Sequence, residues 1–532
     1  MSLKTCRSRV VVVAVALLTA GCDDSTAPAP ATKLAFLAQP TSSELGAPIA
    51  PAVRVAIQDA SGATVDSATG TVTVAIGANP GGGTLSGTTT VAAVNGIAVF
   101  ADLRIDRMAT GFTLAATSGT LTGAASAAFD IRPLSVARVP VSGGADNTCG
   151  VTMGGAAYCW GYNNRGQLGG GTTTDTTSPA AVGGGLSFAA VGAAVGGPSR
   201  CGVTTAGVAY CWGSNVYGAL GDGTTSNQTS PVAVAGGLTF AAVSSGGGAT
   251  TCGVTTAGAA FCWGINTVGQ LGIGTTTGSE VCGNNPCSTT PVAVGGGLTF
   301  ITVSTGASHT CGVTAAGAAY CWGANRNGQL GIGTTTGTPL CNGFSCSPTP
   351  VPVVGGLTFA AVSAGTGYTC GVTTAGAAYC WGYNGTGQLG DGTATERLSP
   401  VAVLGGLTFA AVSTAGDPSG SGHTCGLTVT GGAYCWGFNH YGELGNGTNT
   451  TRSSPGAVSG GLTFTALAVG SNQSLSGHAH TCGVTTAGVA YCWGSNGNGQ
   501  LGVGTTTGPQ DCFGDPCSIT PVAVPGGLNF TP

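Results

Sequence analysis

The sequence predicts an all-β protein, a seven-bladed β-propeller preceded by a β-sandwich. Three observations carry this prediction. First, one unit recurs seven times, and the first cysteines of consecutive copies lie 51 to 59 residues apart. Second, each copy reads as about four short strands separated by glycine-rich turns, which is typical of a propeller blade. Third, residues 33–132 lack this unit and instead show short stretches in which apolar and polar residues alternate.

Residues 1–22 are predicted to be an export signal. Lys4, Arg7 and Arg9 precede the apolar run Val10–Ala20, which at 11 residues is shorter than the ~20 needed to span a bilayer. The small residues before Cys22 resemble a bacterial lipobox, in which this cysteine would be lipidated. The large aliphatic residue lies four residues before the cysteine instead of three, so an ordinary signal peptide is the alternative. Residues 23–32 form a linker rich in Ala and Pro. We therefore expect an exported protein, either a lipoprotein of the cell envelope or cell surface that touches the membrane only through its lipid, or a secreted one.

The segment 33–132 is expected to form the β-sandwich. Alternation is clearest in the stretches Val53–Asp59, Thr71–Ile76, Ile97–Leu103 and Phe112–Thr117. Roughly 100 residues of such strands fit a sandwich. The runs that start at Val53 and Gly96 resemble bacterial immunoglobulin-like modules of the invasin type, and this resemblance implies a spacer on a cell surface.

Twenty cysteines follow Cys22, and they form ten close pairs with none left over. In an exported chain such pairs are predicted to be disulfides. A zinc site would need two to four residues between paired cysteines, with further ligands nearby. The nine-residue spacing of the seven long pairs does not match a zinc site. Seven pairs have nine residues between them: Cys149 and Cys159, Cys201 and Cys211, Cys252 and Cys262, Cys311 and Cys321, Cys370 and Cys380, Cys425 and Cys435, and Cys482 and Cys492. Three have four between them and are expected on surface loops: Cys282 and Cys287, Cys341 and Cys346, and Cys512 and Cys517.

Turn chemistry and cysteine spacing predict the same hairpin in every copy. Gly376 lies six residues after Cys370, and a glycine holds this place in all seven copies. Glycine suits the left-handed last residue of a three-residue hairpin loop. With that loop at 374–376, Val372 pairs with Ala378, and Cys370 faces Cys380.

The propeller is expected to span residues 133–532. The seven tryptophans of the chain hold one place in the unit: Trp160, Trp212, Trp263, Trp322, Trp381, Trp436 and Trp493. A phenylalanine precedes each of the last six copies, and a seventh, Phe530, lies two residues before the end. We expect Phe530 to pack beside the first blade and close the ring.

The repeats resemble the regulator of chromosome condensation repeat family, a family of seven-bladed propellers. The likeness rests on His309-Thr-Cys-Gly-Val, Tyr320-Cys-Trp-Gly and Gly328-Gln-Leu-Gly-Ile-Gly, which recur with small changes in each copy. It implies that the tryptophans anchor the blade cores. It also implies a structural hydrogen-bonding role for His309, His423 and His480, which lie two residues before a cysteine. Nuclear members act on a small GTPase and on chromatin, roles that this chain does not suit.

Charge excludes several classes of function. Only 6% of residues are charged, and past residue 138 the chain has ten acidic residues, five arginines and no lysine. It therefore lacks the basic footprint of a nucleic-acid-binding protein and the lysine of a phosphate-binding loop. Asp222 and Asp391 are expected to cap turns and not to bind calcium. No catalytic, cofactor or metal site is predicted.

The function that these patterns favour is a non-catalytic binding or adhesion scaffold. We expect a monomer whose propeller loops, including Asn227, Gln228 and Arg397, bind a protein or glycan. The alternative is an envelope enzyme, a polysaccharide hydrolase or lyase built from scattered loop residues. An acidic pair converging on one face would favour the enzyme.

Overall fold

The computed structural model describes residues 29–530 except 42, 45–48, 50, 81, 106–108, 133–140, 193, 196, 248, 337, 338, 342, 418 and 472–477. The predicted export signal and Cys22 therefore lie outside the described residues, as does most of the linker. Every regular element in the described part is a β-strand, which confirms the all-β class. None of these residues belongs to a helix with the length and hydropathy needed to cross a membrane.

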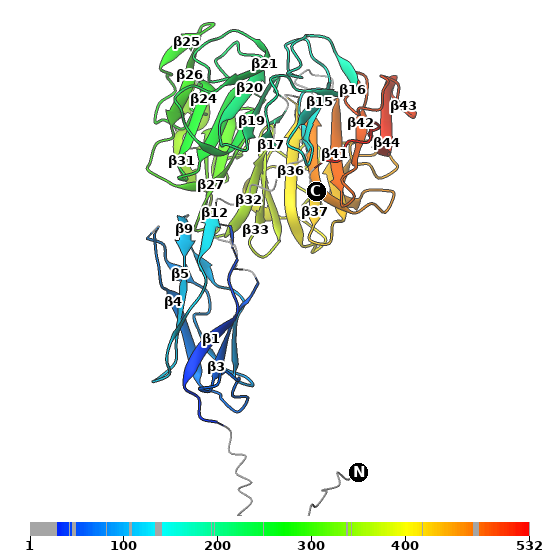
Figure 1. The fold of residues 1–532 in the computed structure, drawn as a ribbon. Helices are drawn as coiled ribbons and strands as arrows, with labels where there is room; N and C mark the ends of the chain where they lie inside the picture. Colours follow the sequence, from blue (N-terminus) through cyan, green and yellow to red (C-terminus); the bar gives the residue numbers. More distant parts are fainter. Residues whose placement is uncertain are drawn as a thin grey trace, which may run out of the picture.

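An N-terminal unit of twelve strands precedes the repeats (Figure 1). Its sheets have the strand orders β1-β3-β7, β11-β10-β4-β6, β2-β12-β9 and β5-β8. The strands are β1 (Lys33–Ala38), β2 (Ser43–Glu44), β3 (Val53–Gln58), β4 (Thr71–Ile76), β5 (Leu85–Ser86), β6 (Thr90–Ala92), β7 (Ile97–Phe100), β8 (Arg104–Ile105), β9 (Ala109–Phe112), β10 (Leu114–Thr117), β11 (Ala124–Ala125) and β12 (Phe129–Arg132).

Alternation along the strands places the core of this unit. In β4, Val72 and Val74 are buried while Thr71 and Thr73 are exposed. Successive side chains of a strand point to opposite faces, so the apolar set turns inward together. Phe100 and Phe112 join the valines in one buried cluster.

Seven sheets follow, each with four consecutive antiparallel strands, and we call them repeat sheets 1 to 7. Sheets 1 to 4 comprise β13 (Val141–Gly143), β14 (Asn147–Val151), β15 (Ala157–Gly161), β16 (Thr176–Ala181); β17 (Phe188–Val191), β19 (Ser199–Thr204), β20 (Ala209–Gly213), β21 (Gln228–Ala233); β22 (Phe240–Gly246), β23 (Thr250–Thr255), β24 (Ala260–Ile265), β26 (Asn285–Ala293); and β27 (Phe300–Thr305), β28 (His309–Thr314), β29 (Ala319–Ala324), β31 (Phe344–Pro352). Sheets 5 to 7 comprise β32 (Phe359–Ala364), β33 (Tyr368–Thr373), β34 (Ala378–Gly382), β35 (Arg397–Ala402); β36 (Phe409–Gly416), β37 (Gly422–Thr428), β38 (Ala433–Gly437), β39 (Arg452–Ala457); and β40 (Phe464–Ser471), β41 (Ala479–Thr485), β42 (Ala490–Ser495), β44 (Asp515–Ala523).

Four short strands extend these sheets. β18 (Ala194–Val195) lies in the connection between β17 and β19 of sheet 2. It runs parallel to β22 and so pairs this connection with sheet 3. The other three are β25 (Glu280–Cys282), β30 (Leu340–Cys341) and β43 (Gln510–Cys512). Each pairs with the fourth strand of its sheet and forms a hairpin that a short disulfide crosses. We call these the stapled hairpins of sheets 3, 4 and 7.

The second and third strands of each repeat sheet form the predicted hairpin. Cys370 lies directly opposite Cys380 in the ladder, and Val372 lies opposite Ala378. Gly376 has φ 83°, the left-handed conformation that the loop requires. The register that turn chemistry predicts for this hairpin is therefore confirmed.

All ten cysteine pairs expected from spacing are bonded in the structure. The seven cross-strand bonds of the hairpins join Cys149 to Cys159, Cys201 to Cys211, Cys252 to Cys262, Cys311 to Cys321, Cys370 to Cys380, Cys425 to Cys435 and Cys482 to Cys492. The three short ones join Cys282 to Cys287, Cys341 to Cys346 and Cys512 to Cys517, within the stapled hairpins. The cross-strand bonds hold Cα atoms 4.0–4.1 Å apart.

One tryptophan joins each repeat sheet to the sheet before it. Its indole N–H donates a hydrogen bond of 2.8–3.0 Å to a backbone carbonyl in the preceding repeat, within the Gly-x-Leu-Gly turn. The pairs are Trp160 with Gln500, Trp212 with Gln167, Trp263 with Ala219, Trp322 with Gln270, Trp381 with Gln329, Trp436 with Gln388 and Trp493 with Glu443. All seven indoles are fully buried, so each N–H would be costly to leave unpaired.

The last glycine of the same turn is required by this tryptophan. A Cβ on Gly390 would lie 2.6 Å from the indole of Trp436, and the φ of Gly390 is 70°. The corresponding glycine of every other repeat meets its tryptophan in the same way: Gly169, Gly221, Gly272, Gly331, Gly445 and Gly502. Glycine therefore serves both the turn and the close approach of the next sheet.

Repeat sheet 7 packs on repeat sheet 1 through the same contacts. Trp160 donates to the Gln500 carbonyl. Phe530 is 1% exposed, bridges to Thr152 and packs on Trp160 with ring centroids 6.2 Å apart. The six earlier phenylalanines pack on their tryptophans at 5.7–6.0 Å. The predicted place of Phe530 beside the first repeat is thus confirmed.

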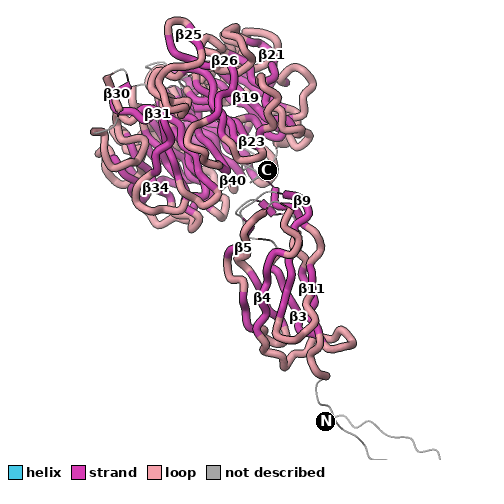
Figure 2. Tube along the Cα trace, turned by 90° about the vertical axis from the view of Figure 1, so that its left-hand side faces the viewer, coloured by secondary structure: helices cyan, strands magenta, loops and turns pink. Residues whose placement is uncertain are grey.

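The repeat sheets have two different ends. We call one end the loop face; it carries the connections from the first to the second strand and from the third to the fourth, which in sheet 5 are 365–367 and 383–396. The opposite end is the turn face, with the cysteine-hairpin turns and the connections to the next sheet, which in sheet 5 are 374–377 and 403–408. Ile301 and Ala315 lie on the turn face of sheet 4 and pack against the core of the N-terminal unit. Figures 1 and 2 show the N-terminal unit at this end and β25 at the other.

Replacing Gly390 with Ala tests the contact between turn and tryptophan. Gly406 is the matched control, because its φ is 61° and nothing lies within 4 Å of its Cβ position. Both variants carry the left-handed cost of roughly 1–2 kcal/mol. We expect Gly390→Ala to lose about 1–3 kcal/mol more, the usual cost of overpacking, in denaturant unfolding. Equal losses would show that the indole contact does not constrain the turn.

Replacing Phe530 with Ala tests how sheets 7 and 1 join. The ring is buried, so we expect the unfolding free energy of the repeat region to fall by roughly 3–5 kcal/mol. Phe513→Ala is the control, because Phe513 is 70% exposed and should cost less than about 1 kcal/mol. A Phe530→Ala variant that unfolds like the parent would mean that the first and last repeats are joined by other contacts.

Candidate binding face

Charge divides the two faces completely. The ten acidic residues and five arginines beyond residue 138 all lie in loop-face connections and stapled hairpins, or within two residues of the start of a strand that leaves this face. The connections of the turn face contain no charged residue and no histidine. The charged side chains of sheets 1 to 7 therefore lie on the loop face.

The three histidines that precede cysteines join neighbouring sheets. Nε2 of His309 lies 2.8 Å from the Thr369 hydroxyl, and His423 and His480 make the same 2.8 Å contact with Thr481 and Thr148. Burial lowers the pKa of each of these histidines to about 3. They are neutral at physiological pH, and they link sheets instead of facing solvent.

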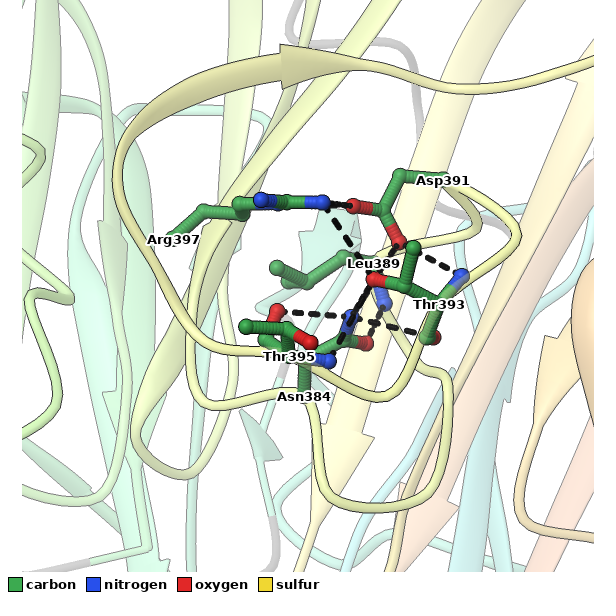
Figure 3. Close-up of polar contacts among 6 residues, drawn as sticks. All are labelled: Asn384, Leu389, Asp391, Thr393, Thr395 and Arg397. Carbon is green, nitrogen blue, oxygen red and sulfur yellow. Dashed lines mark hydrogen bonds and ion pairs between the residues drawn. The ribbon is translucent and has the colours of Figure 1, made fainter.

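The two aspartates of the Leu-Gly-Asp-Gly-Thr turns hold their own loops. In sheet 5, one oxygen of Asp391 accepts hydrogen bonds from the backbone N–H and hydroxyl of Thr393, and the other accepts from Arg397 Nε at 2.8 Å (Figure 3). The side chain of Asn384 bridges the same loop (Figure 3), with the partners Leu389, Asp391, Thr393 and Thr395. Asp222 caps Thr224 in the same way.

Two of the residues expected to bind a partner also serve their loops. Arg397 forms an ion pair with Asp391 at 2.7 Å. The side chain of Asn227 accepts the backbone N–H of Asn215 at 2.8 Å. Gln228 begins β21 and is half-buried. These residues lie on the loop face, but loop order depends on the first two.

Sequence reasoning missed a group of rings between repeat sheets 6 and 7. We call it the sheet 6–7 cluster; its members are Phe438, His440, Tyr441, His478, Phe513 and Asp515. The ring centroids of Phe438 and His440 are 4.4 Å apart, and those of His440 and Phe513 are 5.2 Å apart. Its signal in the sequence was Phe-Asn-His-Tyr at 438–441, where three rings fall within four residues.

The polar half of the cluster surrounds one carboxylate. Asp515 Oδ2 lies 3.1 Å from His478 Nε2, and the His478 ring contacts Tyr441 edge-on at 4.7 Å. Partial burial and, next, the charge of Asp515 raise the pKa of the Tyr441 phenol. The carboxylate of Asp515 therefore contacts the His478 ring, which in turn contacts Tyr441.

The stapled hairpins present apolar side chains to solvent. Val281 is 75% exposed, Leu340 72%, Phe344 45% and Phe513 70%. In sheet 4 the guanidinium of Arg326 covers Phe344, with its Cζ 3.2 Å from the ring centroid. Phenylalanine is enriched in protein interfaces, so Phe344 and Phe513 are the candidate anchors among these exposed side chains.

Glu443 stands where most repeats have the glutamine of the Gly-Gln-Leu-Gly turn. Its Oε2 accepts a hydrogen bond of 3.0 Å from the backbone N–H of Tyr441. In five other repeats the glutamine Oε1 accepts the same bond from the backbone N–H of the residue two positions earlier. Burial raises the pKa of Glu443 to about 8, and the charge of Asp417 adds to the shift. A neutral acid at pH 7 can thus replace a neutral amide.

The acidic pair that would favour an enzyme is present but enclosed. Glu443 and Asp417 are each at most 1% exposed. The backbone carbonyl of Glu443 accepts hydrogen bonds from Trp493 and Thr481, so the residue is part of the junction between sheets 6 and 7. The side chains of Glu280, Cys282 and Cys287 bring three possible metal-binding atoms together. The two cysteine sulfurs are bonded to each other in a disulfide, so they are not free to bind a metal ion.

Comparison with known proteins matches the repeats. The sequence pattern described as "Regulator of chromosome condensation (RCC1) repeat" matches residues 154–198, 206–252, 257–313, 316–372, 375–427 and 430–476, and a second pattern of this description matches 300–329, 359–388 and 476–500. The ultraviolet-B receptor UVR8 of Arabidopsis thaliana is 31% identical over 367 residues, covering 68% of this chain and 78% of that protein. The human E3 ubiquitin-protein ligase HERC2 is 30% identical over 368 residues, which are 67% of this chain but 7% of that protein.

Solved structures show the same fold in the repeats. Yeast RCC1 (Prp20), in a crystal structure with Kap60, has a TM-score of 0.57 at 18% identity, over 74% of this chain and 87% of that chain. Human WBSCR16 has a TM-score of 0.56 at 18% identity, over 70% of this chain and 94% of that chain. The repeat matches cover more than half of the sequence, and the chain therefore belongs to the regulator of chromosome condensation (RCC1) repeat family.

Proposed function

We propose that this protein is an exported, lipid-anchored, non-catalytic binding protein. An immunoglobulin-like spacer at 33–132 carries a closed seven-bladed propeller at 133–532, and Cys22 carries the lipid. The ten disulfides support an oxidising compartment. Four-stranded sheets joined in one repeating contact, with sheet 7 packed on sheet 1, support the closed propeller.

The loop face binds the partner. The observation that carries this proposal is the separation of charge, since every charged residue and histidine from β13 onward lies at the end opposite the N-terminal unit. A spacer at the turn face would leave the loop face free to point away from the anchor. The yeast relative is seen with Kap60, which supports a protein over a glycan as the class of partner.

An envelope hydrolase or lyase is the less favoured function. It would need an acidic pair that a substrate can reach, whereas Glu443 is fully buried and contributes to the contact between two sheets. The ligase names of some relatives belong to proteins of which this chain covers a small part, 19% for human HERC4 and 7% for HERC2.

Capture from an envelope extract tests the binding face. The full exported chain is compared with a loop-face variant, Val281→Thr with Leu340→Thr, and a turn-face variant, Met153→Thr with Val429→Thr. All four side chains are more than 60% exposed, so the fold should persist. We expect the loop-face variant to lose the captured protein at least tenfold and the turn-face variant to keep it. The reverse pattern would place the binding face at the other end.

Replacing Cys22 with Ser tests the anchor. Removal of the lipid should release the protein from the membrane fraction, because little else would hold it there. The measurement is the distribution of the protein between membrane and soluble fractions. Unchanged partitioning would contradict lipidation at Cys22 and favour an ordinary signal peptide.

A further inference from the structure

Phe513 has a backbone conformation that a large side chain rarely adopts. Its φ is 56°, and it is the first central residue of the stapled hairpin turn of sheet 7. The corresponding residue in sheet 3 is Gly283, with φ 54°. Two-residue turns with positive φ at both central positions favour Gly and Asn. A phenylalanine there strains the backbone and gains little from burial, since 70% of it is exposed. Such strain points to function more readily than to packing.

The hairpin of sheet 4 shows what such an exposed ring can hold. There the guanidinium of Arg326 lies 3.2 Å from the ring centroid of Phe344. The attraction of a cation to the face of an aromatic ring accounts for this contact. Phe513 contacts the His440 ring and remains mostly exposed.

Negative charge lies on both sides of Phe513. Asp511 and Asp515 are two residues before and after it, and Asp511 is exposed. The side chain of Asp515 is 41% exposed beside His478. A surface hollow adjoins the hairpin and is lined by Thr507, Gly508, Pro509, Gln510, Asp511, Gly514 and Pro516. An exposed ring on a hairpin that carries two carboxylates, with a hollow beside the hairpin, suits an extended cationic segment.

We propose that the sheet 6–7 cluster, together with Asp511, binds an arginine or lysine side chain of a partner protein. The cation lies on the exposed face of Phe513 and between the two carboxylates, and the neighbouring backbone of the partner lies in the hollow. This inference rests on the proposed function, and it names the chemistry of the partner that the loop face takes. His440 contacts the ring of Phe513, and Phe438 contacts His440.

The test uses the full chain and a fluorescently labelled peptide of four Gly-Arg repeats, with a Gly-Glu peptide of the same length as the control. We expect the arginine peptide to bind in low salt and the glutamate peptide not to bind. Phe513→Gly should weaken binding about two- to fivefold, the range for an exposed cation–ring contact. Asp515→Asn should weaken it by a similar factor.

Two matched variants separate this site from general attraction. Phe344→Ala should leave binding unchanged, because Arg326 already occupies that ring. Arg326→Ala should uncover Phe344 without adding a second peptide site, because the stapled hairpin of sheet 4 has no acidic residue. Phe513→Gly should unfold at the same temperature as the parent or a higher one, because glycine relieves the strained turn. A destabilised Phe513→Gly variant would make Phe513 a structural residue and overturn the proposal.

Failure of this inference differs from failure of the proposed function. Equal weakening by Phe344→Ala, no effect of Phe513→Gly, or equal binding of both peptides would overturn the cation site. Binding of a neutral oligosaccharide that Phe513→Gly abolishes would replace the cation with a glycan. In each of these cases, capture that depends on the loop face would still stand.

Discussion

The indole N–H of one tryptophan per repeat donates to a carbonyl in the repeat before it, and the architecture of residues 141–530 depends on this contact. Each bond crosses a boundary between sheets, so it joins two units that could not bury their apolar faces alone. The last glycine of the Gly-x-Leu-Gly turn lets the turn approach the indole closely. The phenylalanine of the next repeat packs on the same indole, as Phe409 does on Trp436. In six repeats a threonine one residue before the cysteine adds a second bond to the same carbonyl, as Thr424 does to Gln388.

Most of this architecture could be predicted from the sequence because the repeats show each constraint seven times. The cysteine-hairpin register followed from the place of Gly376, and the position of Phe530 followed from the six earlier phenylalanines. The partner of each indole could not be predicted, since it lies 44 to 52 residues away in another repeat for six tryptophans and 340 residues away for Trp160. The burial of Glu443 could not be predicted either, and burial decides whether that carboxylate is charged.

The candidate site was harder to predict because it breaks the repeat pattern. Phe438, His440 and Phe513 come from two repeats and meet only when sheets 6 and 7 lie side by side. The histidines that do follow the pattern are structural, and they link neighbouring sheets through threonine hydroxyls. In this fold, residues shared by all repeats build the scaffold, and departures from the repeat mark the candidate site.

The most direct measurement of the central claim is hydrogen exchange at the seven indole N–H groups, followed by NMR. We predict seven slowly exchanging signals, because every indole is buried and bonded to the preceding repeat. Trp160 is decisive, since its partner Gln500 lies 340 residues away at the other end of the repeat region. Protection of Trp160 equal to that of the other six would support a ring closed by the same contact throughout. Rapid exchange at Trp160 alone would contradict it.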